Sequence, residues 1–136
     1  MVPARADDVF AALSADPTTW TEWFPGLSDG GYEGPPPYGV GSKRFVSVGR
    51  TTYRETIMAW DAPTRWTYRV DATNAPVARA LLEEWTVDGR GDASIVRWTF
   101  AVDPSPLLRM TAALMPIVLG RLFRKAMANL SARLAH

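Results

Sequence analysis

The middle of the chain alternates between apolar and polar residues with a period of two, and this pattern constrains the fold more than any other feature. Short turn sequences such as Gly49-Arg50 and Asp61-Ala62-Pro63 interrupt the alternation. Connections of this length join antiparallel neighbours, so the sequence predicts an antiparallel sheet built from consecutive strands. The predicted strands are Lys43 to Val48, Thr51 to Trp60, Arg65 to Val70, Arg79 to Val87 and Ala93 to Val102.

Helical patterns flank these strands on both sides. Residues 4–14 have the apolar spacing of a short amphipathic helix, and Asp16 before Pro17 predicts the capped start of a second one. Gly and Pro dominate residues 29–41, which predicts a loop with only a short strand around Tyr32. One long helix is expected over residues 106–134. We therefore predict a single α+β domain over residues 1–136, in which a curved antiparallel sheet of six to seven strands wraps around the C-terminal helix.

Composition excludes several kinds of chemistry. The chain has no cysteine, and its one histidine is the terminal residue His136. Thiolate nucleophiles, disulfides, Cys/His zinc sites and histidine-activated serine or cysteine nucleophiles are therefore not expected. We predict no metal site and no cofactor. Any chemistry is left to carboxylates, tyrosines and arginines inside the domain.

Charge and hydropathy limit the partners. Fifteen Lys and Arg residues against fourteen Asp and Glu give a formal charge of +1, far from the basic excess of a nucleic-acid binder. The chain has no run of 18 apolar residues, and its start lacks the apolar core of a secretory signal. We expect no nucleic-acid partner, no stable membrane insertion and a cytoplasmic location. The basic residues of the C-terminal helix form either a solvated face or a surface that docks on anionic lipid.

Strand alternation predicts which side chains point toward the long helix. In the third strand the set of Tyr53, Glu55, Ile57 and Ala59 is favoured over the alternate set that contains Met58 and Trp60. The other predicted inward residues are Trp66, Tyr68, Val70, Leu81, Glu83, Trp85, Val87, Val96, Trp98 and Phe100.

Two carboxylates are thereby predicted to lie in an apolar interior. Buried carboxylates are costly unless they are hydrogen-bonded, paired with a cation or protonated. Glu83 and Glu55, with the Tyr68 hydroxyl, are the candidate catalytic groups for proton transfer. The alternative is that the two glutamates pair structurally with Arg44 or Arg54 on neighbouring strands.

Several local motifs in a fixed order resemble the START-like (SRPBCC) superfamily, and within it the bacterial polyketide cyclase/dehydrase and lipid-transport family. The motifs are Val2-Pro3-Ala4 before Asp8-Val9-Phe10-Ala11-Ala12-Leu13, then Trp20-Thr21-Glu22-Trp23, Gly41-Ser42-Lys43-Arg44-Phe45, Glu55 to Pro63 and Pro104-Ser105-Pro106-Leu107-Leu108. The resemblance implies the helix-grip fold. Members of the family usually have a strand before the first motif, and in this sequence it is short or missing. An uncovered strand edge invites pairing with another chain, so we expect a weak homodimer.

The resemblance also implies a cavity between the sheet and the C-terminal helix that holds a hydrophobic small molecule such as a polyketide, lipid or sterol-like compound. Two alternatives remain: a polyketide cyclase or dehydratase that uses the interior carboxylates and tyrosines, and a co-chaperone-like protein-interaction module. Leu27 stands where the aromatase/cyclase branch has a pocket tyrosine, and Met58 or Ala59 where it has an arginine, so ligand binding is favoured. The predicted ligand-binding residues are Trp23, Phe24, Phe45, Tyr53, Trp66, Tyr68, Glu83, Trp85, Trp98, Phe100, Met110, Leu114 and Ile117.

Overall fold

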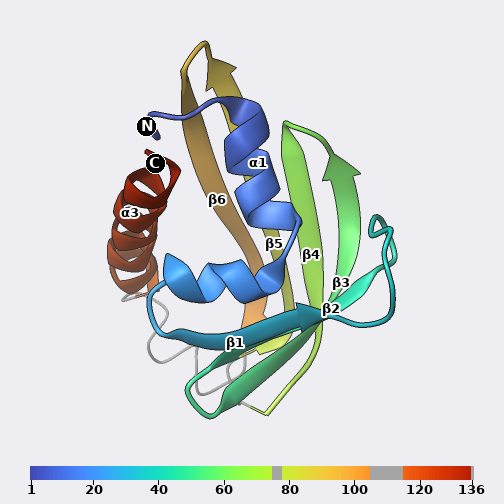
Figure 1. Cartoon of the computed structure of the whole chain (residues 1–136). Helices are drawn as coiled ribbons and strands as arrows, with labels where there is room; N and C mark the ends of the chain where they lie inside the picture. Colours follow the sequence, from blue (N-terminus) through green and yellow to red (C-terminus); the bar gives the residue numbers. More distant parts are fainter. Residues whose placement is uncertain (75–77, 105–114, 136) are drawn as a thin grey trace.

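Six consecutive strands form one antiparallel sheet in the order β1-β2-β3-β4-β5-β6 (Figure 1). The structure, a computed structural model, describes residues 1–74, 78–104 and 115–135. The strands are β1 Leu27–Tyr32, β2 Lys43–Val48, β3 Thr51–Asp61, β4 Arg65–Thr73, β5 Ala78–Arg90 and β6 Ala93–Pro104. The predicted α+β class and the antiparallel order are confirmed.

The hairpin turns follow the turn sequences. Gly49 and Gly91 each have a positive φ, 60° and 66°, at the start of a two-residue connection. Glycine adopts this conformation without steric cost, which is why both tight turns form at these positions. β5 extends to Arg90, beyond its predicted end at Val87, because Asp88 to Arg90 still pair with β6.

The first strand is longer than the sequence predicted. β1 begins at Leu27 and pairs with β2 through Gly30 and Gly31, within the segment predicted as loop. A Cβ at Gly30 would lie 3.0 Å from the backbone oxygen of Pro17, and one at Gly31 would lie 3.2 Å from the ring of Phe45. The glycines therefore permit close packing in a strand rather than interrupting it.

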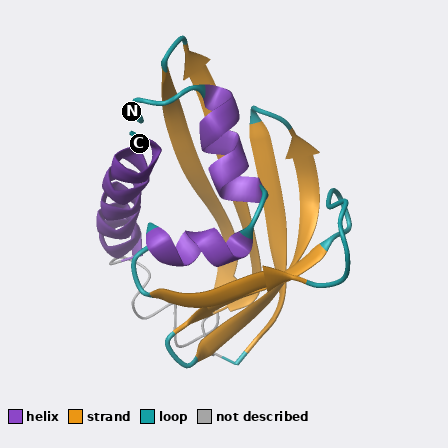
Figure 2. Ribbon diagram, viewed as in Figure 1, coloured by secondary structure: helices purple, strands orange, loops and turns teal. Residues whose placement is uncertain are grey.

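Two short helices cover the inner face of the sheet, the face on which the helices of the described residues lie (Figure 2). The α-helix α1, Ala6–Ser14, buries Val9, Phe10 and Leu13. A Cβ at Gly89 of β5 would lie 3.2 Å from the Ala6 Cβ, so this glycine gives the helix room at the sheet. The 3₁₀-helix η1, Pro17–Glu22, begins at Asp16, whose side chain accepts the N–H of Thr18 as predicted.

The C-terminal helix α3, Met115–Leu134, packs on the core through one stripe. Ala126 and Leu130 are fully buried, and Phe123 and Met127 pack against the buried cluster. The predicted first half of this helix, with Met110 and Leu114, falls in residues 105–114, outside the described part of the chain.

The segment before α1 contributes one bridge to the sheet. Val2 exchanges both backbone hydrogen bonds with Ser94 of β6, each 2.8 Å long, and its side chain is buried. The hydroxyl of Ser94 donates to the Ala4 carbonyl at 2.7 Å. The short first strand expected from the sequence is therefore represented, among the described residues, by a single antiparallel bridge at the edge of β6.

Candidate functional site

Three neighbouring strands present aromatic side chains to the inner face. Trp85 of β5 stacks on Trp98 of β6 with ring centroids 5.0 Å apart, and Trp98 contacts Phe100 at 4.5 Å. On β4, Trp66 contacts Tyr68 at 5.1 Å. The predicted inward orientation of these side chains is confirmed.

The third strand changes phase at a bulge. Tyr53, Glu55 and Ile57 lie on the inner side as predicted, but the β3–β4 register shifts between Ile57 and Ala59. Beyond the shift Trp60, rather than Ala59, pairs with Trp66 and packs on the core. The prediction for Ala59 was wrong because a bulge adds one residue and reverses the alternation after it.

A buried ion pair joins β2 and β3. Arg44 lies directly opposite Glu55, and its Nε donates to Glu55 Oε1 at 2.6 Å. Both side chains are at most 2% exposed. The guanidinium lies 4.9, 4.6 and 4.5 Å from the ring centroids of Trp20, Trp66 and Tyr68. The aromatic faces favour the cation where water cannot reach it.

Glu83 is held by different partners. Tyr68 lies opposite it across β4 and β5 and donates its hydroxyl to Glu83 Oε1 at 2.7 Å. The indole N–H of Trp98 donates to the same oxygen at 2.9 Å. The alternative of structural pairing with Arg44 or Arg54 is therefore confirmed for Glu55 with Arg44, whereas the hydrogen bonds of Glu83 come from a phenol and an indole.

Burial governs the titration of these groups. It raises the pKa of Glu83 to about 7, and the negative charge of Glu55 adds to that effect. Burial also raises the pKa of Glu55, against the opposing influence of Arg44. The pKa of Tyr68 is raised well above its usual value by burial, so its hydroxyl remains a donor. Glu83 is therefore a carboxyl that gains or loses a proton near neutral pH.

Among the residues that the structure describes, three buried donors have no hydrogen-bond partner: Trp23 Nε1, Trp66 Nε1 and Arg44 Nη1. Buried polar groups in folded proteins are almost always satisfied by protein or ordered water. All three are N–H groups, so the unsatisfied polar atoms among the described buried side chains are donors. Oxygen atoms of a bound molecule or of water are the groups that would satisfy them.

Seven of the predicted ligand-binding residues fall into two zones. Trp23, Trp66 and Trp85 are at most 1% exposed and belong to the packed core. A second set keeps partial exposure on the inner face and is the part that a ligand could touch without displacing the core. We call this set the accessible zone; it consists of Phe24, Tyr53, Trp98 and Phe100.

Two predicted ligand contacts lie elsewhere. Phe45 alternates with the buried Arg44 and Val46, so its ring lies on the outer face, against Gly31. Ile117 is 54% exposed, and it lies nine residues before Ala126, half a turn away from the buried stripe of α3. These two assignments are corrected. Met110 and Leu114 are outside the described residues.

Strand alternation did not predict the packing of Trp60 on this core, which also contains Trp20. Trp20 contacts Trp23, Trp66 and Trp85 and donates its indole N–H to the Leu13 carbonyl at 2.9 Å. Its place at helical spacing from Trp23 was a signal for core packing. No sequence signal marked the bulge that turns Trp60 inward.

The described residues offer no group of three or more His, Asp or Glu side chains suited to a metal ion. Within the same residues, no helix is long and apolar enough to span a membrane.

Relatives of known sequence align over most of the chain. An uncharacterized protein of Mycobacterium tuberculosis is 26% identical over 134 residues, which cover 95% of this chain and 80% of the relative. A protein of Mycobacterium bovis, also uncharacterized, aligns with the same values.

Solved structures share the fold. The solution structure of a protein from Thermobifida fusca superimposes with a TM-score of 0.72 at 25% identity, covering 99% of this chain and 91% of that one. Major latex-like protein 151 of Panax ginseng gives a TM-score of 0.70 at 15% identity, with coverage of 98% and 92%. The di-domain aromatase/cyclase (ARO/CYC) StfQ of the steffimycin biosynthetic pathway gives 0.68 at 21% identity, covering 93% of this chain and 41% of that one.

The family model described as "Polyketide cyclase / dehydrase and lipid transport" matches residues 1–135, nearly the whole chain. Together with the curled six-stranded sheet and the C-terminal helix packed on its inner face, this match shows that the chain belongs to the polyketide cyclase/dehydrase and lipid transport family.

Proposed function

We propose that the protein binds a hydrophobic small molecule on the inner face of the sheet, against the accessible zone formed by Phe24, Tyr53, Trp98 and Phe100. The observation that carries the proposal is the position of Glu83. Glu83 is 7% exposed, and its carboxyl accepts a hydrogen bond from Trp98, which belongs to the accessible zone. A ligand lying on these rings would meet one carboxyl group at the bottom of an aromatic surface.

Aromatic contacts in the accessible zone support a flat or polycyclic ligand. Phe24 meets Trp98 edge-on at 5.8 Å, and Phe123 of α3 meets the same indole at 6.1 Å. The indole of Trp98 is thus in contact with the rings of Phe24, which follows η1, Phe100 of β6 and Phe123 of α3. Planar ligands gain both buried area and ring contacts on such a surface.

A titration of the purified protein with an anthraquinone, a flat ketone, tests the proposal through quenching of tryptophan fluorescence. We expect saturable quenching, and a loss of affinity of about tenfold in Phe100→Ala, because removing a contacting ring removes about 1.4 kcal/mol or more of apolar contact. Phe45→Ala is the matched control, since Phe45 is also half-buried but on the outer face. Equal losses in the two variants, or no saturation, would contradict the proposal.

A second candidate function is proton-transfer catalysis of the cyclase or dehydratase kind, favoured by the pKa of about 7 at Glu83. In a dehydration, the carboxylate would accept the proton from the carbon next to a ketone, and the carboxylic acid would then return it to the departing hydroxyl, which leaves as water. Tyr68 would act as a positioning residue, because its hydroxyl holds Oε1.

Glu83→Gln separates the two functions. The amide keeps the shape and accepts hydrogen bonds, but it cannot shuttle a proton. With a β-hydroxyketone thioester as substrate, catalysis at Glu83 predicts that dehydration falls to background in Glu83→Gln while affinity changes less than tenfold, about 1.4 kcal/mol. Unchanged turnover in Glu83→Gln would reject the catalytic role. If the wild type binds this substrate without turning it over, ligand binding is the only one of the two functions that stands.

A further inference from the structure

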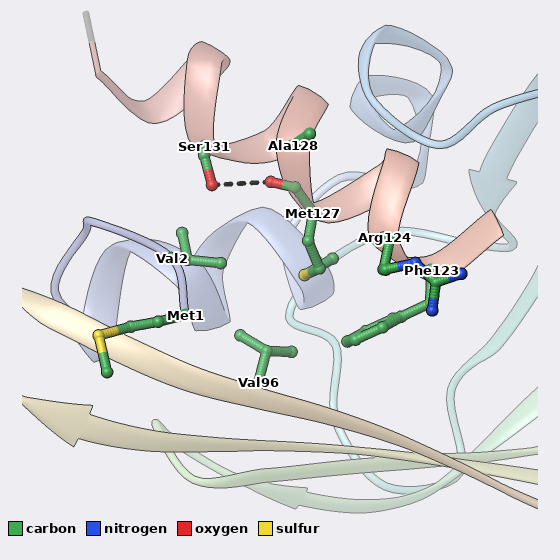
Figure 3. Close-up of a pocket in the computed structure, with 8 residues that line it drawn as sticks. All are labelled: Met1, Val2, Val96, Phe123, Arg124, Met127, Ala128 and Ser131. Atoms are coloured by element: carbon green, nitrogen blue, oxygen red, sulfur yellow. Dashed lines mark hydrogen bonds between the residues drawn. The ribbon is translucent and has the colours of Figure 1, made fainter. Parts of the chain in front are cut away.

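The helix α3 has an inner side that packs on the sheet and an outer side that the proposed function does not use. Phe123 and Met127 line the pocket drawn in Figure 3, which belongs to the space between the sheet and α3, and they point toward Val96 of β6. Ala128 points away from the sheet in the same view. Figure 1 shows α3 at the edge of the molecule, with the sheet to one side of it.

Five exposed side chains gather on the outer side of the first turns of α3. They follow one another at intervals of three, four and seven residues, and residues at these intervals lie on the same side of a helix. We call this set the outer face of α3. It consists of Ile117, Val118, Arg121, Arg124 and Lys125.

The outer face is strongly basic. Among the described residues, none of its three cations takes part in an ion pair, whereas Arg133 near the end of α3 pairs with Glu22 of η1 at 2.8 Å. The sequence of α3 contains no acidic residue. Because the whole chain has a formal charge of only +1, three positive charges on one face leave the rest of the chain with an excess of negative charge. The field at the outer face therefore favours an anionic partner.

Two apolar side chains lie beside these cations. Ile117 is 54% exposed and Val118 is 61% exposed, and Arg121 follows them one turn later on the same face. Nucleic acids attract cations through their phosphates, but those contacts bury no aliphatic side chain. An anionic bilayer accommodates both kinds of group, because its phosphates lie at the surface and the acyl chains begin directly beneath them. The combination of cations with exposed aliphatic residues therefore favours a membrane surface over other polyanions.

We propose that the outer face of α3 is a docking surface for a bilayer that contains anionic phospholipid. Ile117 and Val118 enter the boundary between head groups and acyl chains, and Arg121, Arg124 and Lys125 pair with lipid phosphates. Each cation near such a surface increases affinity about fivefold, the equivalent of about 1 kcal/mol. The inner side of α3 stays packed on the sheet, so docking does not depend on ligand binding at the accessible zone.

Flotation of the full chain with vesicles measures docking. We expect binding to vesicles of equal parts phosphatidylglycerol and phosphatidylcholine, and none to phosphatidylcholine alone. Binding should weaken as the salt concentration rises, because salt screens exposed charges. A variant that combines Arg121→Gln, Arg124→Gln and Lys125→Gln should bind about a hundredfold more weakly, the product of three fivefold effects.

The matched control removes the same charge from other surfaces. It combines changes at three exposed cations that form no ion pair among the described residues: Arg5→Gln, Arg50→Gln and Arg97→Gln. This variant has the same net charge as the first one. It should keep its vesicle affinity within about fivefold of the wild type, the contribution of a single cation near the surface.

A fluorescent probe tests which side of the molecule meets the lipid and leaves all three cations in place. The chain has no cysteine, so Val118→Cys creates a unique site for an environment-sensitive fluorophore. Its emission should shift to the blue on anionic vesicles, because the probe enters an apolar boundary. The control is Val40→Cys, at a residue that is 69% exposed in the segment between β1 and β2, and its emission should not change.

Four results would overturn the proposal. They are no binding of the wild type to anionic vesicles, equal affinity for the two kinds of vesicle, equal losses in the two triple variants, and no blue shift at Val118→Cys. If instead the wild type binds duplex DNA or associates with itself through the three cations of α3 and does not bind vesicles, the outer face belongs to a nucleic acid or to a second copy of the chain.

Discussion

Glu55→Gln should destabilise the protein more than any other change of one functional group on the inner face. The substitution keeps the shape of the side chain and removes its charge. Arg44 then remains as a cation that is 1% exposed and already has one N–H group, Nη1, without a partner. An arginine cannot escape by losing its proton, so the full cost of an unpaired buried charge stays in the folded state.

Removing one partner of a buried ion pair typically costs about 3–5 kcal/mol, against a total stability of about 5–15 kcal/mol for a domain. For a chain of this size that corresponds to a fall in Tm of about 10–20 °C. Contacts of the guanidinium with the rings of Trp20, Trp66 and Tyr68 offset a part of the cost, because they persist without the carboxylate.

The reverse substitution, Arg44→Met, should cost less. Glu55 loses its cation but can take up a proton, and burial already raises its pKa. A carboxyl with a pKa higher in the folded than in the unfolded state favours folding more as the pH falls. The defect of Arg44→Met should therefore shrink from pH 8 to pH 5, whereas the defect of Glu55→Gln should not.

Urea denaturation of the wild type, both single variants and the double variant forms a complete cycle. We expect the double variant to be more stable than Glu55→Gln, because the unpaired cation is gone. The reasoning would be refuted by a Glu55→Gln defect below about 1 kcal/mol, or by single effects that simply add in the double variant.

Three further predictions concern other parts of the fold. Because burial raises the pKa of Glu83 to about 7 from about 4.5 when unfolded, its stabilising contribution is complete below pH 4.5 and is lost as the pH rises to 7. The unfolding free energy should thus fall by about 2–3 kcal/mol from pH 5 to pH 8 in urea titrations of the wild type, relative to Glu83→Gln. Gly30→Ala should cost about 1–3 kcal/mol, because its Cβ would meet Pro17, whereas Gly39→Ala, with open space around it, should be close to neutral in the same assay. Sedimentation equilibrium should detect a weak dimer through the β6 edge at high concentration, and a strictly monomeric protein would contradict that expectation.

The sequence predicted the orientation of side chains correctly where apolar and polar residues alternate along a strand without interruption. On β4, β5 and β6 the period of two correctly assigned Trp66, Tyr68, Glu83, Trp85 and Trp98 to one face. It also brought the candidate carboxylates into an apolar interior, and composition left them as the groups able to transfer protons.

The sequence did not predict local structure or pairing where these depend on packing between segments that are distant along the chain. Gly30 and Gly31 look like a loop, yet they form a strand because Pro17 and the Phe45 ring approach them closely. The predicted strands narrowed the partner of Glu55 to two arginines, Arg44 and Arg54, but only the β2–β3 register selects Arg44.

Two register shifts between β3 and β4 determine how the Arg44–Glu55 and Tyr68–Glu83 pairs come to lie on the same face of the sheet. The first leaves Asp71 as an extra residue on β4, and the second leaves Met58 as an extra residue on β3. Asp71 is bonded to Thr56 and Arg69, and Met58 is 44% exposed, so both extra residues are accommodated away from the core.

Between the two shifts, Glu55 lies opposite Val70 and Ile57 lies opposite Tyr68, so the four side chains point to the same face of the sheet. The β2–β3 register is regular and holds Arg44 opposite Glu55, while the regular β4–β5 register holds Tyr68 opposite Glu83. Without the bulges, a slip of one residue would turn either the ion pair or the Tyr68–Glu83 pair toward solvent. The irregular positions of β3 and β4 therefore bring the inward faces of the two halves of the sheet into register, so that a charged pair and a titratable carboxyl share one apolar interior.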